Sequence, residues 1–210
     1  MPTVLWFHGL GADKEVHLPE LQLFADAGLL AIGVDAAGHG QRPLPDFQRL
    51  FSGVADASGA LFKTLVGQTI SELPVLIDAL VDRGLSDPQH IGVAGVSMGG
   101  CIVYGAIAAD RRVRAAVALL GSPACSCSDG AEQAPARFFP TALLSITADD
   151  DQVVPPAAAQ ALHQQLLHAY ASQPERLAYR VIPGAAHCMR PEQWAGAVAQ
   201  TSAWLVRFVP

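Results

Sequence analysis

The sequence lacks any cluster of lysine and arginine side chains. It contains 13 Lys and Arg residues against 19 Asp and Glu residues, which gives a formal net charge of −6. Because binding to a phosphate backbone depends on clustered basic side chains, this charge balance argues against nucleic acid as a partner. Charged residues make up only 15% and hydrophobic residues 51%, a composition that predicts a well-buried interior. A chain of 210 residues suits one domain, which we place over residues 1–210.

Targeting and membrane signals are also scarce. The first eight residues show no basic segment leading into a long apolar one, so we expect no secretory signal. The uncharged run at 91–109 approaches the length that crosses a bilayer. Five glycines and Ser97 interrupt this run, and we interpret it as a buried strand, a tight turn and a buried helix. These features predict a cytoplasmic protein with no membrane partner.

Cysteines are few and do not form a metal-binding pattern. The four are Cys101, Cys125, Cys127 and Cys188. Their spacing matches no zinc motif, so we predict no metal and no cofactor, and we interpret the cysteines as free thiols. A redox pair formed by Cys125 and Cys127 is the alternative.

Apolar segments of strand length alternate with segments of helix length, without internal repeats or low-complexity linkers. The predicted strands are Thr3–Phe7, Leu29–Val34, His90–Ala94, Ala115–Leu120, Ala142–Thr147 and Leu177–Ile182. Several are continuous hydrophobic runs, which is typical of strands covered on both faces. The alternation predicts an α/β protein, a three-layer α/β/α sandwich around a mostly parallel sheet of about six strands.

Two regions between the strands carry further expectations. Leu73, Ile77 and Leu80 form part of an apolar helical face, and Ser71 would cap this helix with Pro74 in its first turn. Residues 38–61 and 121–140 form the longest irregular stretches. Both follow strands, so we expect both at the carboxyl edge of the sheet, where open α/β sheets bind ligands.

Residues 95–99 read Gly-Val-Ser-Met-Gly and fit the pattern Gly-x-Ser-x-Gly. A strand pattern precedes them and a helix pattern follows, which is the setting of a nucleophilic serine on a sharp turn. Gly95 and Gly99 lack Cβ atoms and allow the strand and the helix to approach each other closely. We interpret Ser97 as the candidate nucleophile. The alternative is an ordinary glycine-rich turn with a solvated serine.

A serine hydroxyl needs a base, and a basic imidazole needs a carboxylate that fixes its tautomer. His187 follows the last predicted strand and would return to the edge that carries Ser97. His163 and His168 fall on a predicted helix, where we expect them to be solvated. Three consecutive acids, Asp149, Asp150 and Asp151, follow another strand and are all candidates for the carboxylate.

The order Ser97, acid, His187 resembles that of the α/β-hydrolase superfamily. Residues 8–11, His-Gly-Leu-Gly, resemble its oxyanion loop, and residues 35–40 resemble the loop after its fourth strand. Residues 87–92 resemble the branch that contains dienelactone hydrolases and prolyl-oligopeptidase-like proteins. In that branch the acid commonly stands directly before a residue followed by Val-x-Pro or Val-Pro. This resemblance favours Asp151.

The resemblance also implies a mechanism and several departures from the family pattern. The oxyanion would be held by the backbone N–H groups of Leu10 and Met98. The sequence begins at the strand that comes third in the family, so the N-terminal strand hairpin is not expected, and neither is a large cap. Segment Leu29–Val34 would then lie at a sheet edge and could pair two copies into a homodimer. Phe47 and Phe51 could line an entrance for substrate or belong to the core.

We therefore hypothesise a serine esterase that cleaves carboxylic esters of small molecules through Ser97, His187 and Asp151 with an acyl-enzyme intermediate. A thioesterase or acyltransferase with the same three residues is the enzymatic alternative. A ligand-binding protein that retains the fold without turnover is the non-enzymatic one.

Overall fold

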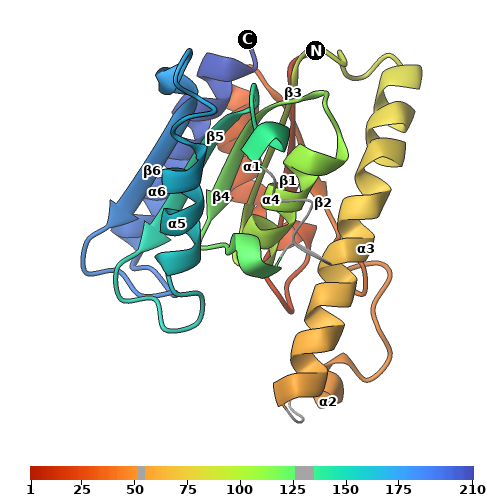
Figure 1. The fold of residues 1–210 in the computed structure, drawn as a ribbon. Helices are drawn as coiled ribbons and strands as arrows, with labels where there is room; N and C mark the ends of the chain where they lie inside the picture. Colours follow the sequence, from red (N-terminus) through yellow and green to blue (C-terminus); the bar gives the residue numbers. More distant parts are fainter. Residues whose placement is uncertain (52–54, 126–134) are drawn as a thin grey trace.

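A computed structural model describes residues 1–51, 55–125 and 135–210 of the chain (Figure 1). Its centre is a six-stranded sheet with the order β2-β1-β3-β4-β5-β6, in which each neighbouring pair is parallel. The strands are β1 (Thr3–Phe7), β2 (Leu30–Val34), β3 (Ile91–Val96), β4 (Val113–Leu119), β5 (Ala142–Ala148) and β6 (Leu177–Ile182). The predicted parallel sheet and its six segments are confirmed.

Helices cover both faces of this sheet and complete the three layers (Figure 1). Helices α1 (Leu18–Asp26) and α6 (Pro191–Phe208) cover one face. The other face carries α3 (Ala55–Asp82), α4 (Met98–Ala109) and α5 (Ala157–Leu166), and α2 (Phe47–Phe51) precedes α3. The 3-10 turns are η1 (Lys14–His17), η2 (Pro123–Cys125), η4 (Pro135–Arg137) and η5 (Pro174–Arg176).

The burial of each strand follows its place in the sheet. Strands β1 and β5 are buried at every residue, and β3 and β4 at all but one. These are the segments that read as near-continuous hydrophobic runs, as expected for parallel strands covered on both faces. Every residue of β2 is only half-buried, because this strand has one neighbour. The predicted edge position is confirmed, and pairing of two copies along this edge stays a prediction.

Two predictions about the region before β3 are wrong. Residues 38–61 are not irregular throughout, since they contain α2 and the first turns of α3. Ser71 does not cap a helix, because α3 runs through it and carries Pro74 in its interior. An interior proline costs roughly 3 kcal/mol. The buried face formed by Leu65, Val66, Leu73 and Ile77 continues on both sides of this proline, and its packing on α4 offsets that cost.

Part of α3, Ser58–Asp82, is also long and apolar enough to cross a membrane by length and composition alone. Its fully buried side chains belong to the same cluster as those of α4. The run at 91–109 forms strand β3, a one-residue turn and α4, as its glycines predict.

His163 is a third correction. It lies on α5, but its side chain is buried and not solvated. Its Nε2 lies 2.8 Å from the hydroxyl of Ser145, which in turn is 2.7 Å from the hydroxyl of Tyr104. This polar chain joins α5, β5 and α4 inside the core, and it satisfies groups that would be costly to bury alone. Burial lowers the pKa of His163 to about 4.

This shifted pKa predicts acid sensitivity. Between the folded pKa of about 4 and the ordinary histidine pKa of about 6.5, the unfolded chain binds a proton at His163 and the folded chain does not. Acidification through this window therefore lowers the free energy of unfolding, by about 2 kcal/mol near pH 5. Denaturant unfolding at neutral and acidic pH should show a smaller loss for His163→Gln than for the wild type. An unchanged loss would contradict the prediction, and the exposed His168→Gln is the matched control.

Candidate active site

Ser97 lies at the carboxyl end of β3, on the single residue that separates this strand from α4. Its backbone has φ +56° and ψ −113°, a conformation that L-residues rarely adopt. The turn is held in place because the N–H of Ser97 donates to the carbonyl of Leu119 at 2.9 Å and its carbonyl accepts from Cys101 at 3.0 Å. Strain of this kind persists only where the surrounding structure fixes it. The hydroxyl is presented at the carboxyl edge of the sheet.

Two glycines make this turn sterically possible. A Cβ atom on Gly99 would lie 2.0 Å from the carbonyl oxygen of Phe7, and one on Gly95 would lie 2.7 Å from the carbonyl carbon of Gly99. Both distances are far below van der Waals contact. The expectation that glycine allows β3 and α4 to approach closely is confirmed, and β1 takes part in the same contact.

The structure brings together the three residues that the sequence singled out. His187 Nε2 lies 2.9 Å from the Ser97 hydroxyl, and His187 Nδ1 lies 2.7 Å from Asp151 Oδ2. Ser97 ends β3, Asp151 follows β5 and His187 follows β6, so three strand ends contribute one side chain each. Such a chain of hydrogen bonds is the geometry in which an imidazole can take a proton from a hydroxyl.

The carboxylate beside His187 is that of Asp151 and not of its two acidic neighbours. Asp151 is 2% exposed, and its Oδ1 accepts from the N–H groups of Val153 at 2.9 Å and Val154 at 2.7 Å. Asp150 is exposed and accepts from the Gln152 amide. Asp149 is also exposed and accepts from the N–H of Ala185, which fastens the loop before His187.

The predicted oxyanion donors flank Ser97. Met98 is the first residue of α4, so its N–H has no partner within the helix. The helix dipole places partial positive charge at this end, which favours a negatively charged group there. Leu10 lies in the loop after β1, where Gly9 packs against Ser97: a Cβ on Gly9 would lie 3.7 Å from that of Ser97. Among the described residues, no partner accepts a hydrogen bond from the N–H of Leu10 or of Met98.

Two histidines fix the loop that carries Leu10, and sequence reasoning did not assign them this role. His39 Nε2 accepts from the N–H of Gly11 at 3.1 Å, while its Nδ1 lies 2.9 Å from the carbonyl of Ala37. His8 is fully buried, bonds the carbonyl of Gly9 through Nδ1 and accepts from Ala36 through Nε2. Burial lowers the pKa of His8 and favours the neutral ring that this pairing needs. The available signal was that His8 directly follows β1 and that His39 lies in the loop after β2.

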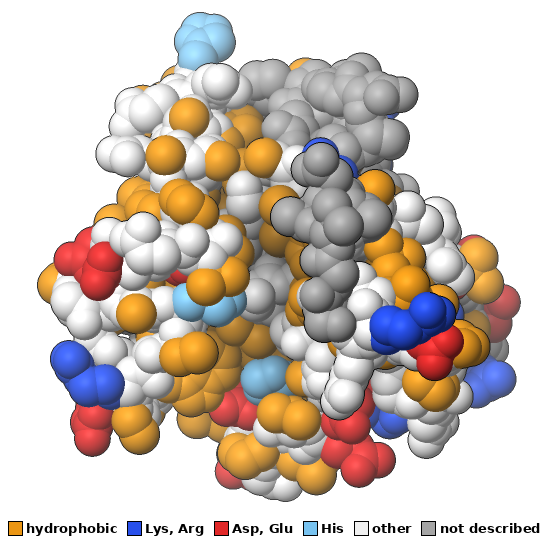
Figure 2. Space-filling view, turned by 90° about the horizontal axis from the view of Figure 1, so that it is seen from below, with side chains coloured by type: hydrophobic (Ala, Val, Ile, Leu, Met, Phe, Trp, Pro, Cys, Tyr) orange, Lys and Arg blue, Asp and Glu red, His pale blue; other side chains and the backbone are white. Residues whose placement is uncertain are grey.

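A cavity of about 530 Å³ opens beside Ser97 and His187. Its wall is largely apolar and includes Leu10, Phe62 and Val154. Figure 2 looks onto this carboxyl edge and shows hydrophobic side chains gathered around a hollow in the face. Among the described residues, Phe47 and Phe51 are not part of the wall. Their rings contact each other, and the Phe47 ring makes an edge contact with His39, next to the loop that carries Leu10.

Two thiols also line this cavity. Cys101 is buried one helical turn after Ser97, and Cys125 ends η2. A hydrogen bond from the Cys101 thiol lowers the pKa of Cys125 to about 7 and raises that of Cys101. Cys101, Cys125 and Cys188 are free, and Cys127 lies outside the described residues. No group of three or more His, Cys, Asp or Glu side chains in the described ranges could hold a metal ion.

Fold and site together define the class of protein. A parallel sheet with a serine on its strand-to-helix turn, and with His187 and Asp151 on later strand ends, is an α/β-hydrolase fold. A solved structure from Klebsiella pneumoniae shares this fold with a TM-score of 0.75 and 18% identity, over 99% of this chain and 88% of that one.

Sequence comparison gives the family. A family model described as the dienelactone hydrolase family matches residues 38–206, and the chain belongs to this family. YitV of Bacillus subtilis (strain 168) is 33% identical over 123 residues, which are 59% of this chain and 46% of YitV. Esterase YjfP of Escherichia coli (strain K12) is 29% identical over 122 residues, 58% of this chain and 46% of YjfP. The chain thus matches these two relatives over about half of their length.

The close contact at the turn predicts a large difference between two glycine substitutions. Gly99→Ala should lower the free energy of unfolding by about 2 kcal/mol or more, because its Cβ would meet the backbone of Phe7. Gly196→Ala is the control on the exposed side of α6, where a Cβ meets nothing within 4 Å. This change should stabilise the helix by about 0.5–1 kcal/mol. Denaturant unfolding of both variants tests the contact, and equal effects would contradict it.

Proposed function

We propose that the chain is a carboxylic-ester hydrolase in which Ser97 is the nucleophile, His187 the general base and acid, and Asp151 the carboxylate partner of His187. The observation that carries this proposal is the continuous hydrogen-bonded chain Ser97–His187–Asp151, in which Ser97 lies on a turn at positive φ. Membership of the dienelactone hydrolase family and similarity to Esterase YjfP support the same activity.

In the proposed acylation step, the Ser97 oxygen attacks the ester carbonyl carbon while its proton passes to His187 Nε2. Asp151 stabilises the resulting imidazolium through Nδ1, at the 2.7 Å contact described above. The carbonyl oxygen becomes an oxyanion between the N–H groups of Leu10 and Met98. One such donor is typically worth roughly 3 kcal/mol in the transition state.

The intermediate then collapses and the bond to the leaving alcohol breaks. His187 returns its proton to the alkoxide oxygen, which leaves as the neutral alcohol, and the acyl group stays on Ser97. In the second half of the reaction, water gives a proton to His187 Nε2 and attacks the acyl carbon. Release of the carboxylic acid restores the serine hydroxyl. Each proton taken by His187 is returned within the same half-reaction.

The walls of the cavity favour an apolar acyl or alcohol group. A volume of about 530 Å³ lies within the range of sites that enclose a small organic molecule. Leu10, Phe62 and Val154 offer it hydrophobic surface, and the polar side chains of the wall besides Ser97 and His187 are His17 and the two thiols, Cys101 and Cys125. This arrangement favours uncharged hydrophobic esters over charged ones.

The first test is a series of p-nitrophenyl esters from acetate to laurate, assayed with the wild type and Ser97→Ala. We expect hydrolysis by the wild type and a loss of at least about 10³-fold in kcat for the variant, because the nucleophile is removed. Ser71→Ala, on the exposed side of α3, is the matched control and should retain activity. No turnover of any ester, together with no labelling of Ser97 by a fluorophosphonate, would refute the proposal.

The role of the carboxylate is tested separately with Asp151→Asn and Asp150→Asn. An amide at 151 cannot stabilise the imidazolium and can impose the wrong tautomer on His187, so kcat should fall by about 10⁴-fold. The same change at the exposed Asp150 should leave kcat within about threefold of the wild type, because among the described residues its carboxylate contacts only Gln152. Comparable losses in the two variants would overturn the choice of Asp151.

A further inference from the structure

A second cavity lies at the opposite edge of the sheet from Ser97. It encloses about 440 Å³ between the segments that lead into β3, β4, β5 and β6 and the end of α6. We call it the amino-edge pocket. The proposed ester hydrolysis does not use it, since all groups assigned to that reaction lie at the carboxyl ends of the strands.

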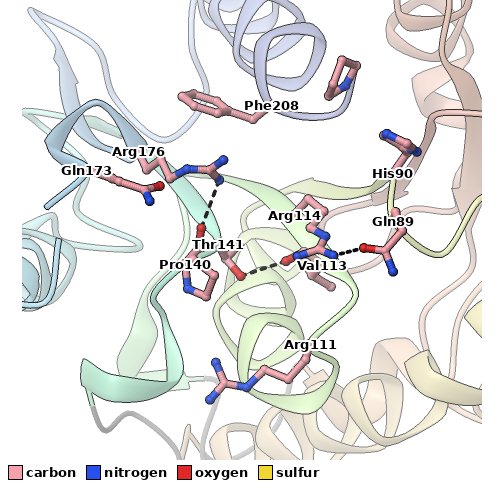
Figure 3. A pocket seen from close by; sticks show the side chains of 11 residues that line it. Gln89, His90, Arg111, Val113, Arg114, Pro140, Thr141, Gln173, Arg176 and Phe208 are labelled. Atoms are coloured by element: carbon pink, nitrogen blue, oxygen red, sulfur yellow. Dashed lines mark hydrogen bonds between the residues drawn. The ribbon is translucent and has the colours of Figure 1, made fainter.

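The amino-edge pocket is cationic although the chain as a whole is acidic. Arg111, Arg114 and Arg176 line it, together with His90, and none of the lining side chains is acidic (Figure 3). His90 is 3.0 Å from Asp87 and so has a carboxylate partner. Three guanidinium groups around one cavity produce a positive potential there, which is favourable only to a negatively charged occupant.

These three arginines contact neutral acceptors. Arg111 donates to the backbone carbonyls of Arg137 and Phe139 at 3.2 Å, and Arg176 donates to the carbonyl of Pro140 at 3.1 Å. Arg114 donates to the side-chain oxygen of Gln89. Within the described ranges, no carboxylate forms an ion pair with any of the three.

Arg112, which lies between Arg111 and Arg114 in the sequence, is by contrast paired with carboxylates. It contacts the carboxylates of both Asp110 and Asp78 at 2.6 Å. A guanidinium has five N–H donors, and the carbonyl contacts of the three pocket arginines use only some of them. The remaining donors and the full positive charges are therefore available to an anion in the pocket.

An aromatic ring forms another wall. Figure 3 shows Phe208 across the pocket from Pro140 and Thr141, with the guanidinium of Arg176 beneath it. The Arg176 guanidinium lies 5.2 Å from the centre of the Phe208 ring, so the ring also orients this side chain. A phosphate alone would occupy only part of such a volume, which leaves room for an organic group against the half-buried Phe208.

We propose that the amino-edge pocket binds a small organic phosphate whose planar ring packs on Phe208 and whose phosphate is held by Arg114 and Arg176. Guanidinium groups bind phosphate oxygens through paired, charge-assisted hydrogen bonds. A phosphate monoester is nearly a dianion at neutral pH and matches several cations better than a single carboxylate does. Binding at this pocket is independent of the proposed esterase activity.

The test is isothermal titration calorimetry of the intact chain with phenyl phosphate, inorganic phosphate and benzoate, each in a low-salt Tris buffer. We expect phenyl phosphate to bind at one site with a Kd below about 1 mM and to weaken as salt is added. Benzoate lacks the dianion and inorganic phosphate lacks the ring, so both should bind more weakly. No saturable binding of phenyl phosphate up to about 10 mM would overturn the proposal.

Variants locate the site. Arg114→Gln and Arg176→Gln should each lower the affinity for phenyl phosphate at least about tenfold. The affinity of Arg176→Lys should lie between those of Arg176→Gln and the wild type. Phe208→Leu should weaken the binding of phenyl phosphate more than that of inorganic phosphate, because it removes the ring contact as well as the support of Arg176. Arg83→Gln, an exposed arginine outside the pocket, should bind like the wild type.

Unchanged affinity in both Arg114→Gln and Arg176→Gln would overturn the proposal, and so would an equal loss in Arg83→Gln. A phenyl phosphate affinity no higher than that of inorganic phosphate would overturn the assignment of Phe208. Circular dichroism of each variant establishes that it is folded. Ester hydrolysis by Arg114→Gln and Arg176→Gln should match the wild type, which keeps this test separate from that of Ser97.

Discussion

The arrangement of the carboxyl edge depends on one close backbone contact, the approach of α4 to β1 and β3 at Gly95 and Gly99. Because neither residue has a Cβ, the helix begins directly behind the strand ends, and the chain must turn within a single residue. That residue, Ser97, is thereby held at φ +56° with its half-buried hydroxyl against His187 and the N–H of Met98 beside it. Such a conformation typically costs about 1–3 kcal/mol in backbone strain, and the packing of the surrounding strands offsets this cost.

The sequence was most informative where one physical requirement dominates. Strands β1, β3, β4 and β5 are buried on both faces, so they must be apolar almost throughout, and the pattern identified them within one or two residues. The glycine spacing around Ser97 has a similar steric cause. Parallel topology placed His187 and the three candidate acids at this edge, since ends of parallel strands meet at one edge, whereas the choice of Asp151 among the three acids came from the family resemblance.

Predictions failed where tertiary contacts override local preference. Pro74 normally marks a helix start, but the apolar face of α3 extends past it and packs on α4, so the helix continues. His163 looks like a surface residue from its sequence neighbours, and only the buried hydroxyl of Ser145 explains why it is inside. His39 is assigned to the loop of Leu10 by a hydrogen bond to Gly11, across 28 residues of sequence. No pattern in a single sequence encodes such a partner.

The three consecutive acids after β5 show how position alone separates chemically identical side chains. Asp149 fastens the loop of His187 through Ala185, and Asp150 stays in solvent. Asp151 is buried, so its oxygens need hydrogen-bond partners inside the protein. The N–H groups of Val153 and Val154 bond one of its oxygens, and His187 bonds the other. These bonds give both oxygens of the carboxylate partners inside the protein, away from solvent. A side chain that is buried and bonded on both oxygens is also fixed in orientation, whereas Asp149 and Asp150 are exposed.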